Sequence, residues 1–186
     1  MEIEQTHIKD ILLLTPKVFS DERGSFFESF RQNIFKDYGI DFNFVQENIS
    51  RSIHSTIRGL HYQVGEFTQG KLCQVLKGSV LDVAVDIRFG SPTFGKYVSV
   101  ELNDDNHYIL WIPPGFAHGF SVLSDEAIFH YRCTQYYSKE HERAILYSDN
   151  DLAIDWNTPN PIISPKDLEA KLFKDIEKDF IYNLTP

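Results

Sequence analysis

Residues 71–87 read KLCQVLKGSVLDVAVDI, which is two apolar runs separated by the short polar turn Lys77-Gly78-Ser79. Apolar runs of this length, rich in Val and Leu and bounded by turn residues, are typical of β-strands. The stretch therefore predicts a compact β-hairpin with strands over 71–76 and 80–87.

Several shorter runs of the same character follow this stretch. They are separated by the polar turn Asn103-Asp104-Asp105-Asn106 and by the strand-breaking sequence Pro113-Pro114-Gly115. An aromatic content of 14% also favours β-structure. Short strands joined by turns predict a mainly β fold, either a sandwich or a small barrel, with further strands over 97–102, 107–112, 120–123 and 127–137.

Helical signals occur only near the two ends of the chain. A short helix is predicted over 29–38, where apolar residues recur at four-residue spacing. Near the C-terminus, Ser164 can cap a helix whose first turn holds Pro165 and Asp167. A helical tail is therefore predicted over about 164–182, with an apolar face made of Leu168, Leu172, Ile176 and Phe180.

Length and composition limit the classes of protein to consider. The 186 residues suit a single domain spanning 1–186. A net charge of −9 repels phosphates, so nucleic acid is not an expected partner. The apolar runs are too short to span a membrane and residues 1–10 lack a signal-peptide pattern, so we expect a cytoplasmic protein without a membrane partner. Cys73 and Cys133 are too few for a disulfide framework and suit buried packing positions.

Two motifs bring polar, chemically active side chains into the apolar pattern. Residues 58–63, RGLHYQ, contain His61, and Lys71 follows ten residues later at the start of a strand. Residues 113–118, PPGFAH, have the Pro-x-Gly-x-x-His form of the second cupin motif. The spacing of His61, Gln63 and Lys71 resembles the first cupin motif, in which His-x-His is followed by Glu.

Two departures from the cupin pattern argue against its usual metal site. Gln63 stands in the position of the second histidine, and Lys71 stands in the position of the glutamate. Cupin-type metal ions need neutral imidazoles and a carboxylate, whereas a protonated lysine repels a cation. We therefore expect a polar pocket without a metal or other cofactor, suited to acid–base chemistry.

A finer resemblance covers most of the chain. Its ordered blocks are 21–28, 46–50, 58–61, 82–88, 91–95, 115–120 and 164–167. In these blocks the sequence resembles the dTDP-4-dehydrorhamnose 3,5-epimerases, a metal-free cupin family. The resemblance implies a cupin-type jelly-roll β-barrel or sandwich with a short N-terminal helix and C-terminal helices.

The resemblance also implies a reaction. It would convert dTDP-4-dehydro-6-deoxy-D-glucose to dTDP-4-dehydro-L-rhamnose, supplying L-rhamnose for surface polysaccharide. Protons beside a ketone are acidic because the carbanion delocalises onto oxygen as an enolate. Epimerisation at C3 and C5 therefore needs a base, an acid on the opposite face and a cation or donor at the oxygen.

Four residues match the family's catalytic positions. His61 matches the base, and Asp167 matches the carboxylate that orients its imidazole and stabilises the imidazolium. Lys71 would stabilise the enolate oxygen, and Tyr131 would return the proton from the opposite face. An acid in the first turn of a helix is also ordinary capping chemistry, and Asp167 can serve both purposes.

The resemblance assigns further residues to substrate binding. Arg58 would bind the diphosphate, for which a bidentate guanidinium is suited, and His118 would help hold the sugar. Phe26 would stack on the base or line the sugar site. The other implied contacts are Arg23, Glu28, Gln46, Glu47, Asn48, Gln63, Tyr137, Glu142 and Lys166. The family is typically a homodimer in which the two chains share their active sites.

The sequence leaves two points of geometry open. Strand alternation places the side chains of Arg58 and His61 on opposite faces of a strand, although the resemblance assigns both residues to one active site. Either Gly59 allows a bulge or bend that re-aims one of them, or Arg58 reaches the diphosphate from the rim. Tyr136 and Tyr137 are also candidates for the acid beside Tyr131.

Other functions remain open at the level of sequence. An epimerase acting at only C3 or only C5, or on another nucleotide sugar, would use the same acid–base residues. A metal-dependent cupin oxygenase or isomerase would retain stoichiometric metal, against which Lys71 and Gln63 argue. A non-catalytic sugar-nucleotide binding module would bind tightly without proton exchange.

Overall fold

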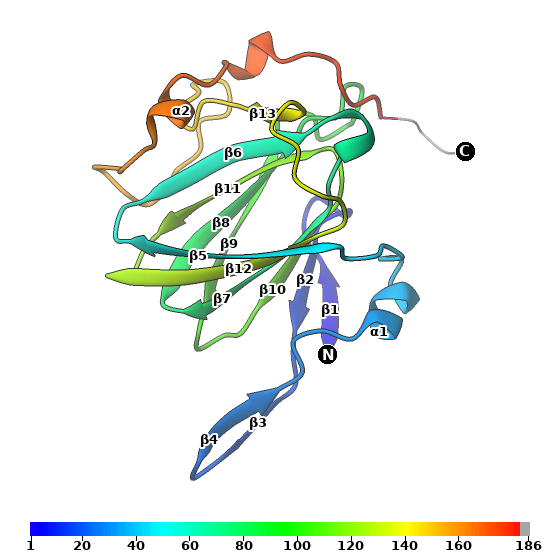
Figure 1. Ribbon diagram of the computed structural model, residues 1–186, viewed down its shortest axis with the longest axis vertical. Coiled ribbons are helices and arrows are strands. Elements are labelled where there is room, and N and C mark those ends of the chain that lie inside the picture. Colours follow the sequence, from blue (N-terminus) through cyan, green and yellow to red (C-terminus); the bar gives the residue numbers. More distant parts are fainter. Residues whose placement is uncertain (183–186) are drawn as a thin grey trace.

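The protein, a computed structural model that describes residues 1–182, is built around two antiparallel β-sheets packed face to face (Figure 1). The six-stranded sheet has the order β1 (Glu2–Gln5), β2 (Leu12–Thr15), β10 (Ile109–Ile112), β7 (Lys71–Lys77), β12 (Glu126–Cys133) and β5 (Gln46–Ile53). The five-stranded sheet has the order β13 (Glu142–Ala144), β6 (Ile57–Gln63), β11 (Phe116–Val122), β8 (Ser79–Asp86) and β9 (Tyr97–Asn103). The mainly β sandwich expected from the sequence is confirmed.

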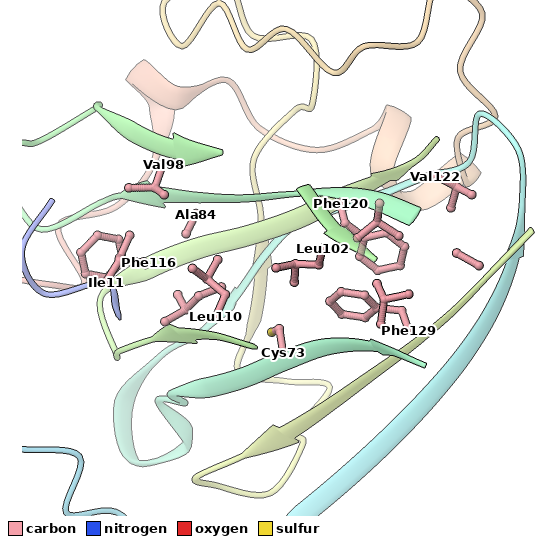
Figure 2. Close-up of a cluster of buried hydrophobic side chains, with 14 of the residues drawn as sticks. Ile11, Cys73, Ala84, Val98, Leu102, Leu110, Phe116, Phe120, Val122 and Phe129 are labelled. Carbon is pink, nitrogen blue, oxygen red and sulfur yellow. The ribbon is translucent and has the colours of Figure 1, made fainter. Parts of the chain in front are cut away.

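Side chains of both sheets meet in one core between the sheets. Cys73 and Phe129 come from the six-stranded sheet, and Ala84 and Phe120 come from the five-stranded sheet (Figure 2). The rings of Phe120 and Phe129 stack with their centroids 4.2 Å apart. Burial of this apolar surface is the main force that holds the two sheets together.

Strand β8 is buried on both faces, which explains its nearly continuous apolar sequence. Val80 and Ala84 face the core between the sheets. Leu81, Val83 and Val85 face a second apolar cluster on the outer side of the five-stranded sheet. The C-terminal part of the chain covers that outer side (Figure 1).

The two strands within 71–87 do not pair with each other, so the predicted hairpin is wrong. β7 pairs with β10 and β12, whereas β8 pairs with β9 and β11 in the other sheet. Lys77-Gly78-Ser79 therefore carries the chain from one sheet to the other. A Cβ on Gly78 would lie 2.1 Å from the carbonyl oxygen of Glu126, because the turn is packed against the start of β12. A turn signal marks where a strand ends but not which sheet the next strand joins.

The helical tail predicted over about 164–182 is wrong beyond its first turn. Only α2 (Pro165–Leu168) and the short 3-10 turn η2 (Phe173–Asp175) are helical. Farther along, the backbone bonds to other segments: the N–H of Phe89 donates to the carbonyl of Phe180 at 2.9 Å. These tertiary hydrogen bonds, with side-chain packing on the five-stranded sheet by Phe173, Ile176 and Phe180, replace the helix that the apolar spacing favours.

The N-terminal part of the chain adds a helix and a projecting hairpin. The helix predicted over 29–38 is present as α1 (Gln32–Asp37). Strands β3 (Val18–Asp21) and β4 (Gly24–Phe27) pair only with each other and extend away from the sandwich (Figure 1). Within residues 1–182 no helix is long and apolar enough to cross a membrane.

Strand β6 contains a bulge that decides which side chains share a face. Arg58 pairs with Phe120 of β11, and His61 pairs with His118. Two residues lie between Arg58 and His61 in β6, but only Gly119 lies between their partners in β11. Gly59 has φ of +129°, and a Cβ on it would lie 2.5 Å from the Cα of Gly119. Only glycine fits this close approach of two backbones. The bulge brings Arg58 and His61 to the same cavity, which settles the conflict with strand alternation.

Candidate active site

Two adjoining cavities collect most of the predicted site residues. The larger, about 630 Å³, lies between β5 and β12 of one sheet and β6 and β11 of the other, beside segment 162–167. Its lining includes Arg58, His61, Lys71, His118, Tyr131, Lys166 and Asp167. The smaller, about 100 Å³, shares His61, Lys71 and Tyr131 with the larger and adds Gln46, Asn48, Gln63, Tyr137 and Glu142.

His61 and Asp167 form a hydrogen-bonded pair at the cavity wall. Nε2 of His61 lies 2.6 Å from Oδ1 of Asp167, whose side chain is only 5% exposed. Burial acts to raise the pKa of the Asp167 carboxyl, but hydrogen bonds from His61, Ser164 and the Gly59 backbone outweigh it and hold that pKa below its usual value. The pair has the arrangement in which a carboxylate fixes the imidazole tautomer and stabilises the imidazolium.

The local sequence explains how Asp167 reaches His61. Ser164 caps α2, with its side-chain oxygen accepting a hydrogen bond from the N–H of Asp167 at 3.1 Å. Pro165 occupies the first turn and helps to fix its backbone. The capping and dyad functions considered for Asp167 therefore coexist in one helical turn.

Lys71 begins β7 and faces the cavity from the sheet opposite His61. Its Nζ lies 3.4 Å from the main-chain carbonyl oxygen of His61. Lys71 forms no salt bridge with any group in the described part of the chain, so its charge is not neutralised by a fixed carboxylate. A cation held this way can stabilise negative charge that develops on a substrate oxygen.

Tyr131 projects inward from β12 on the same side of the cavity as Lys71. Burial raises the pKa of its hydroxyl to about 12, so Tyr131 retains its proton at neutral pH. Tyr136 and Tyr137 are 59% and 52% exposed, and the Tyr137 hydroxyl donates to Glu142 at 2.8 Å. Of the three tyrosines, Tyr131 alone combines burial with a place in both cavities.

A second histidine–carboxylate pair lies at the cavity floor. Nε2 of His118 is 2.6 Å from Oδ1 of Asp82, which is fully buried. Burial lowers the pKa of His118, although the neighbouring Asp82 carboxylate opposes that shift. Sequence analysis did not identify Asp82 as a site residue. Its position within the apolar run 79–86 was a signal that could have done so, because a buried acid needs a polar partner.

Arg58 is held in place from the neighbouring strand. Its Nε donates to Oγ of Ser52 at 3.0 Å, and both residues line the larger cavity. Ser52 was also missed by sequence analysis, because a serine in a strand carries no signal of its own. Because this bond uses Nε, and the terminal guanidinium nitrogens bond to no side chain within residues 1–182, those nitrogens can contact an anionic group.

The smaller cavity is lined by an interlinked polar set. Glu142 accepts from Tyr137 and forms a short ion pair with Lys166 of α2. These two bonds outweigh the effect of burial and lower the pKa of the Glu142 carboxyl. Gln46 accepts from the N–H of Tyr137 at 2.8 Å and donates to Asn48 at 3.0 Å.

Four of the predicted binding residues lie elsewhere. Glu47 points to the outer face of the six-stranded sheet, where it pairs with His130 and Arg132. Arg23 and Phe26 lie on the β3–β4 hairpin, and Glu28 directly follows it. None of the four lines the larger or the smaller of these adjoining cavities.

The positions that hold metal in other cupins do not form a metal site. The side-chain amide of Gln63 donates to two main-chain carbonyls, of Phe67 at 2.9 Å and of Tyr136 at 3.0 Å, and its oxygen accepts from Ser138. Lys71 presents an ammonium where a carboxylate ligand would be needed. The residues present therefore do not suit the usual cupin metal, as the sequence indicates.

Replacing Asp167 by Asn tests the paired carboxylate. Because the folded-state pKa of Asp167 lies below its ordinary value of 3.8, the stabilisation that its carboxylate provides is complete above that pH and is lost as the pH falls through the folded pKa. Asp167→Asn is expected to lower the free energy of unfolding by about 1–3 kcal/mol at neutral pH. The difference from wild type should shrink progressively as the pH falls below about 4, measured by urea unfolding.

Asp37→Asn, in an exposed position of α1, is the matched control and should show no such convergence. The free energies of unfolding of wild type and Asp167→Asn would differ by the same amount at every pH if Asp167 were not ionised in the pair, and that result would contradict the assignment.

Comparison with known proteins agrees with this geometry. A family model described as dTDP-4-dehydrorhamnose 3,5-epimerase matches residues 5–175. The dTDP-4-dehydrorhamnose 3,5-epimerase of Shigella flexneri is 51% identical over 178 residues, covering 95% of this chain and 98% of that protein. A dTDP-6-deoxy-D-glucose-3,5-epimerase from Legionella pneumophila, solved with dTDP-4-keto-L-rhamnose, superimposes with a TM-score of 0.94 at 49% identity over 98% of each chain.

A more distant structure shares the same fold. A 3′-monoepimerase from Streptomyces bikiniensis, in complex with dTDP-quinovose, matches with a TM-score of 0.86 at 31% identity, over 91% of this chain and 87% of that chain. The family model spans residues 5–175, which include every lining residue of the two cavities. This chain therefore belongs to the dTDP-4-dehydrorhamnose 3,5-epimerase family.

Proposed function

We propose that this chain is an isomerase that epimerises dTDP-4-dehydro-6-deoxy-D-glucose at C3 and C5 to give dTDP-4-dehydro-L-rhamnose. The observation that carries the proposal is the His61–Asp167 pair, which faces Lys71 and Tyr131 across one cavity. The wall opposite the base thus supplies both an unneutralised cation and a protonated phenol. This set matches the needs of proton transfer beside a ketone.

The residues divide the reaction between the two sheets. Nε2 of His61 is bonded to Asp167, so its Nδ1 is the nitrogen left to take a proton from the sugar carbon. Lys71 stabilises the enolate oxygen, and Tyr131 delivers a proton from the other sheet, which inverts the carbon. Because base and acid approach from different walls, return of the proton to the original face is disfavoured.

The charge distribution suits a nucleotide diphosphate substrate. The chain carries a net charge of −9, yet Arg58, Lys71 and Lys166 line the larger cavity. Local cations in an acidic protein favour a small anionic ligand over a polyanion such as nucleic acid. Arg58, oriented by Ser52, binds the diphosphate, while Gln46, Asn48 and Tyr137 contribute to the nucleotide side of the site. A soluble nucleotide sugar as substrate also fits the expected cytoplasmic location and a single domain over 1–186.

A single-carbon epimerase is the alternative that a specific observation favours. The structural match to a 3′-monoepimerase shows that an enzyme with this fold can be one that epimerises a single carbon. The same acid and base would serve, and the position of the sugar relative to Tyr131 would decide which carbon is inverted.

Incubation with dTDP-4-dehydro-6-deoxy-D-glucose in heavy water separates these functions. We expect deuterium at both C3 and C5, detected by nuclear magnetic resonance, because Tyr131 delivers a solvent-exchanged deuteron to each carbon from which His61 has removed a proton. Incorporation at one carbon would replace the proposal with a single-carbon epimerase. No incorporation at either carbon would overturn epimerisation of this substrate, and tight binding without exchange would favour a binding module.

We also propose that the working form is a homodimer with shared active sites. The β3–β4 hairpin projects away from the sandwich with Phe19 56% and Phe26 71% exposed (Figure 1). An isolated two-stranded hairpin is marginally stable in water, and exposed aromatic side chains favour a partner surface. The outer face of β5 also exposes Ile49 and Ile53. Arg23, Phe26 and Glu28 would then complete the site of the second copy.

Mixing two inactive variants tests the shared site. A dimer of one His61→Ala chain and one Arg23→Ala chain contains one site with both changes and one site with neither. Random exchange between the variants should therefore restore up to about a quarter of wild-type sites. The measurement is epimerase activity after co-refolding, with each variant refolded alone as the control. Absence of any gain on mixing, with mixed dimers verified by mass spectrometry, would show that Arg23 and His61 act within the same chain.

A further inference from the structure

Three potential metal ligands meet in the core beside the larger cavity, and His118 is the one of the three that lines that cavity. Cys73 comes from β7, Asp82 from β8 and His118 from β11, so the cluster bridges the two sheets. One donor atom from each lies within 4.8 Å of the other two. Sγ of Cys73 is 3.8 Å from Nε2 of His118, which is itself 2.6 Å from Oδ1 of Asp82. Cys73 and Asp82 are fully buried, and His118 is 6% exposed.

Only one of the two carboxylate oxygens of Asp82 has a hydrogen-bond partner among the described residues. Oδ2 of Asp82 is buried and has no hydrogen-bond partner among residues 1–182. A buried charged oxygen without a partner is costly, and such a position is stabilised by any cation that can reach it. The aromatic neighbours Phe120 and Phe129 supply no donor.

We propose that Cys73, Asp82 and His118 form a binding site for a thiophilic divalent cation of the Zn²⁺ class. Thiolate, imidazole and carboxylate are the ligands that Zn²⁺ prefers, and three protein ligands leave its fourth position for another donor. This site shares His118 with the second cupin motif, but it takes its other two ligands from Cys73 and Asp82 and uses neither Gln63 nor Lys71. It also does not depend on which sugar the protein binds.

The spacing of the donors suits a tetrahedral ion after a small adjustment. Zn–N and Zn–O bonds of about 2.0–2.2 Å and a Zn–S bond of about 2.3 Å place tetrahedral donor atoms about 3.3–3.6 Å apart. The Sγ–Nε2 distance of 3.8 Å is close to this range, while the 2.6 Å Nε2–Oδ1 contact must open as the cation replaces the shared proton. The ion enters through the cavity, because the imidazole of His118 lines its wall.

Binding of the ion releases one proton and redistributes another. The Cys73 thiol, whose pKa is raised by burial, loses its proton to solvent when sulfur binds the metal. The proton on Nε2 of His118 moves to Nδ1, so the tautomer changes. Zn²⁺, one thiolate and one carboxylate then sum to zero charge, which avoids repulsion with the nearby Lys71.

The changed tautomer has a functional consequence that rests on the proposed function. The Asp82 carboxylate can only accept a hydrogen bond, so Nε2 of a neutral His118 carries the proton in this contact and Nδ1 is the unprotonated nitrogen. Metal on Nε2 makes Nδ1 a donor instead and places an ion beside the cavity. Zn²⁺ is therefore expected to inhibit sugar turnover.

Titration of the purified protein with Zn²⁺ alone, by calorimetry in two buffers of different ionisation enthalpy, tests the site directly. We expect one ion per chain, one proton released per ion and an affinity that rises about tenfold per pH unit. Substitution of Co²⁺ should give a thiolate-to-metal charge-transfer band. Cys73→Ser should lose the band and weaken Zn²⁺ binding by at least about tenfold, whereas the matched variant Cys133→Ser should retain both.

Asp82→Asn provides a second variant if Cys73→Ser folds poorly, and it should weaken Zn²⁺ binding while circular dichroism shows a folded chain. Zn²⁺ binding of equal strength in wild type and both variants would overturn the site, as would the absence of Zn²⁺ binding by wild type. The binding measurements use no substrate, so they stand even where epimerase activity fails. Wild-type turnover that is unaffected by bound Zn²⁺ would contradict the inhibitory consequence.

Discussion

The hydrogen bond between His61 and Asp167 is the interaction on which the active site depends. It joins β6 of the sandwich to α2, and three local features align its partners: the β6 bulge, the Gly59 backbone N–H and the Ser164 cap. The same bulge brings Arg58 to the cavity. One irregularity in a strand thus places the proposed base and the proposed phosphate ligand on one side, and the opposite sheet supplies Lys71 and Tyr131.

Sequence reasoning succeeded where a residue's identity carries its chemistry. His61, Lys71, Tyr131 and Asp167 were predicted from the resemblance to the epimerase family, and the structure brings all four to one cavity. It failed for topology, because a Lys77-Gly78-Ser79 turn looks the same whether the next strand joins the same sheet or the opposite one. It also failed for the tail, where hydrogen bonds to distant segments, such as Phe89 to Phe180, override the local helical spacing.

Burial separates the roles of similar side chains. Of the three tyrosines considered as the acid, Tyr131 is the one whose pKa burial raises to about 12, whereas Tyr137 is bonded to Glu142 at the rim. The two histidine–carboxylate pairs differ in the same way: His61 is partly exposed to the cavity, while His118 and Asp82 lie in the core. A histidine–carboxylate pair at the solvent-accessible cavity wall suits proton exchange with substrate and solvent. A pair buried in the core suits the orientation of a side chain or the binding of a cation.

The central claim is that His61 is the base. It is tested most directly by deuterium incorporation into dTDP-4-dehydro-6-deoxy-D-glucose with His61→Ala, measured beside dTDP binding by the same preparation. The proposed mechanism predicts that incorporation at C3 and C5 is abolished while dTDP binds with nearly wild-type affinity. Incorporation at the wild-type rate would remove His61 as the base and contradict the mechanism.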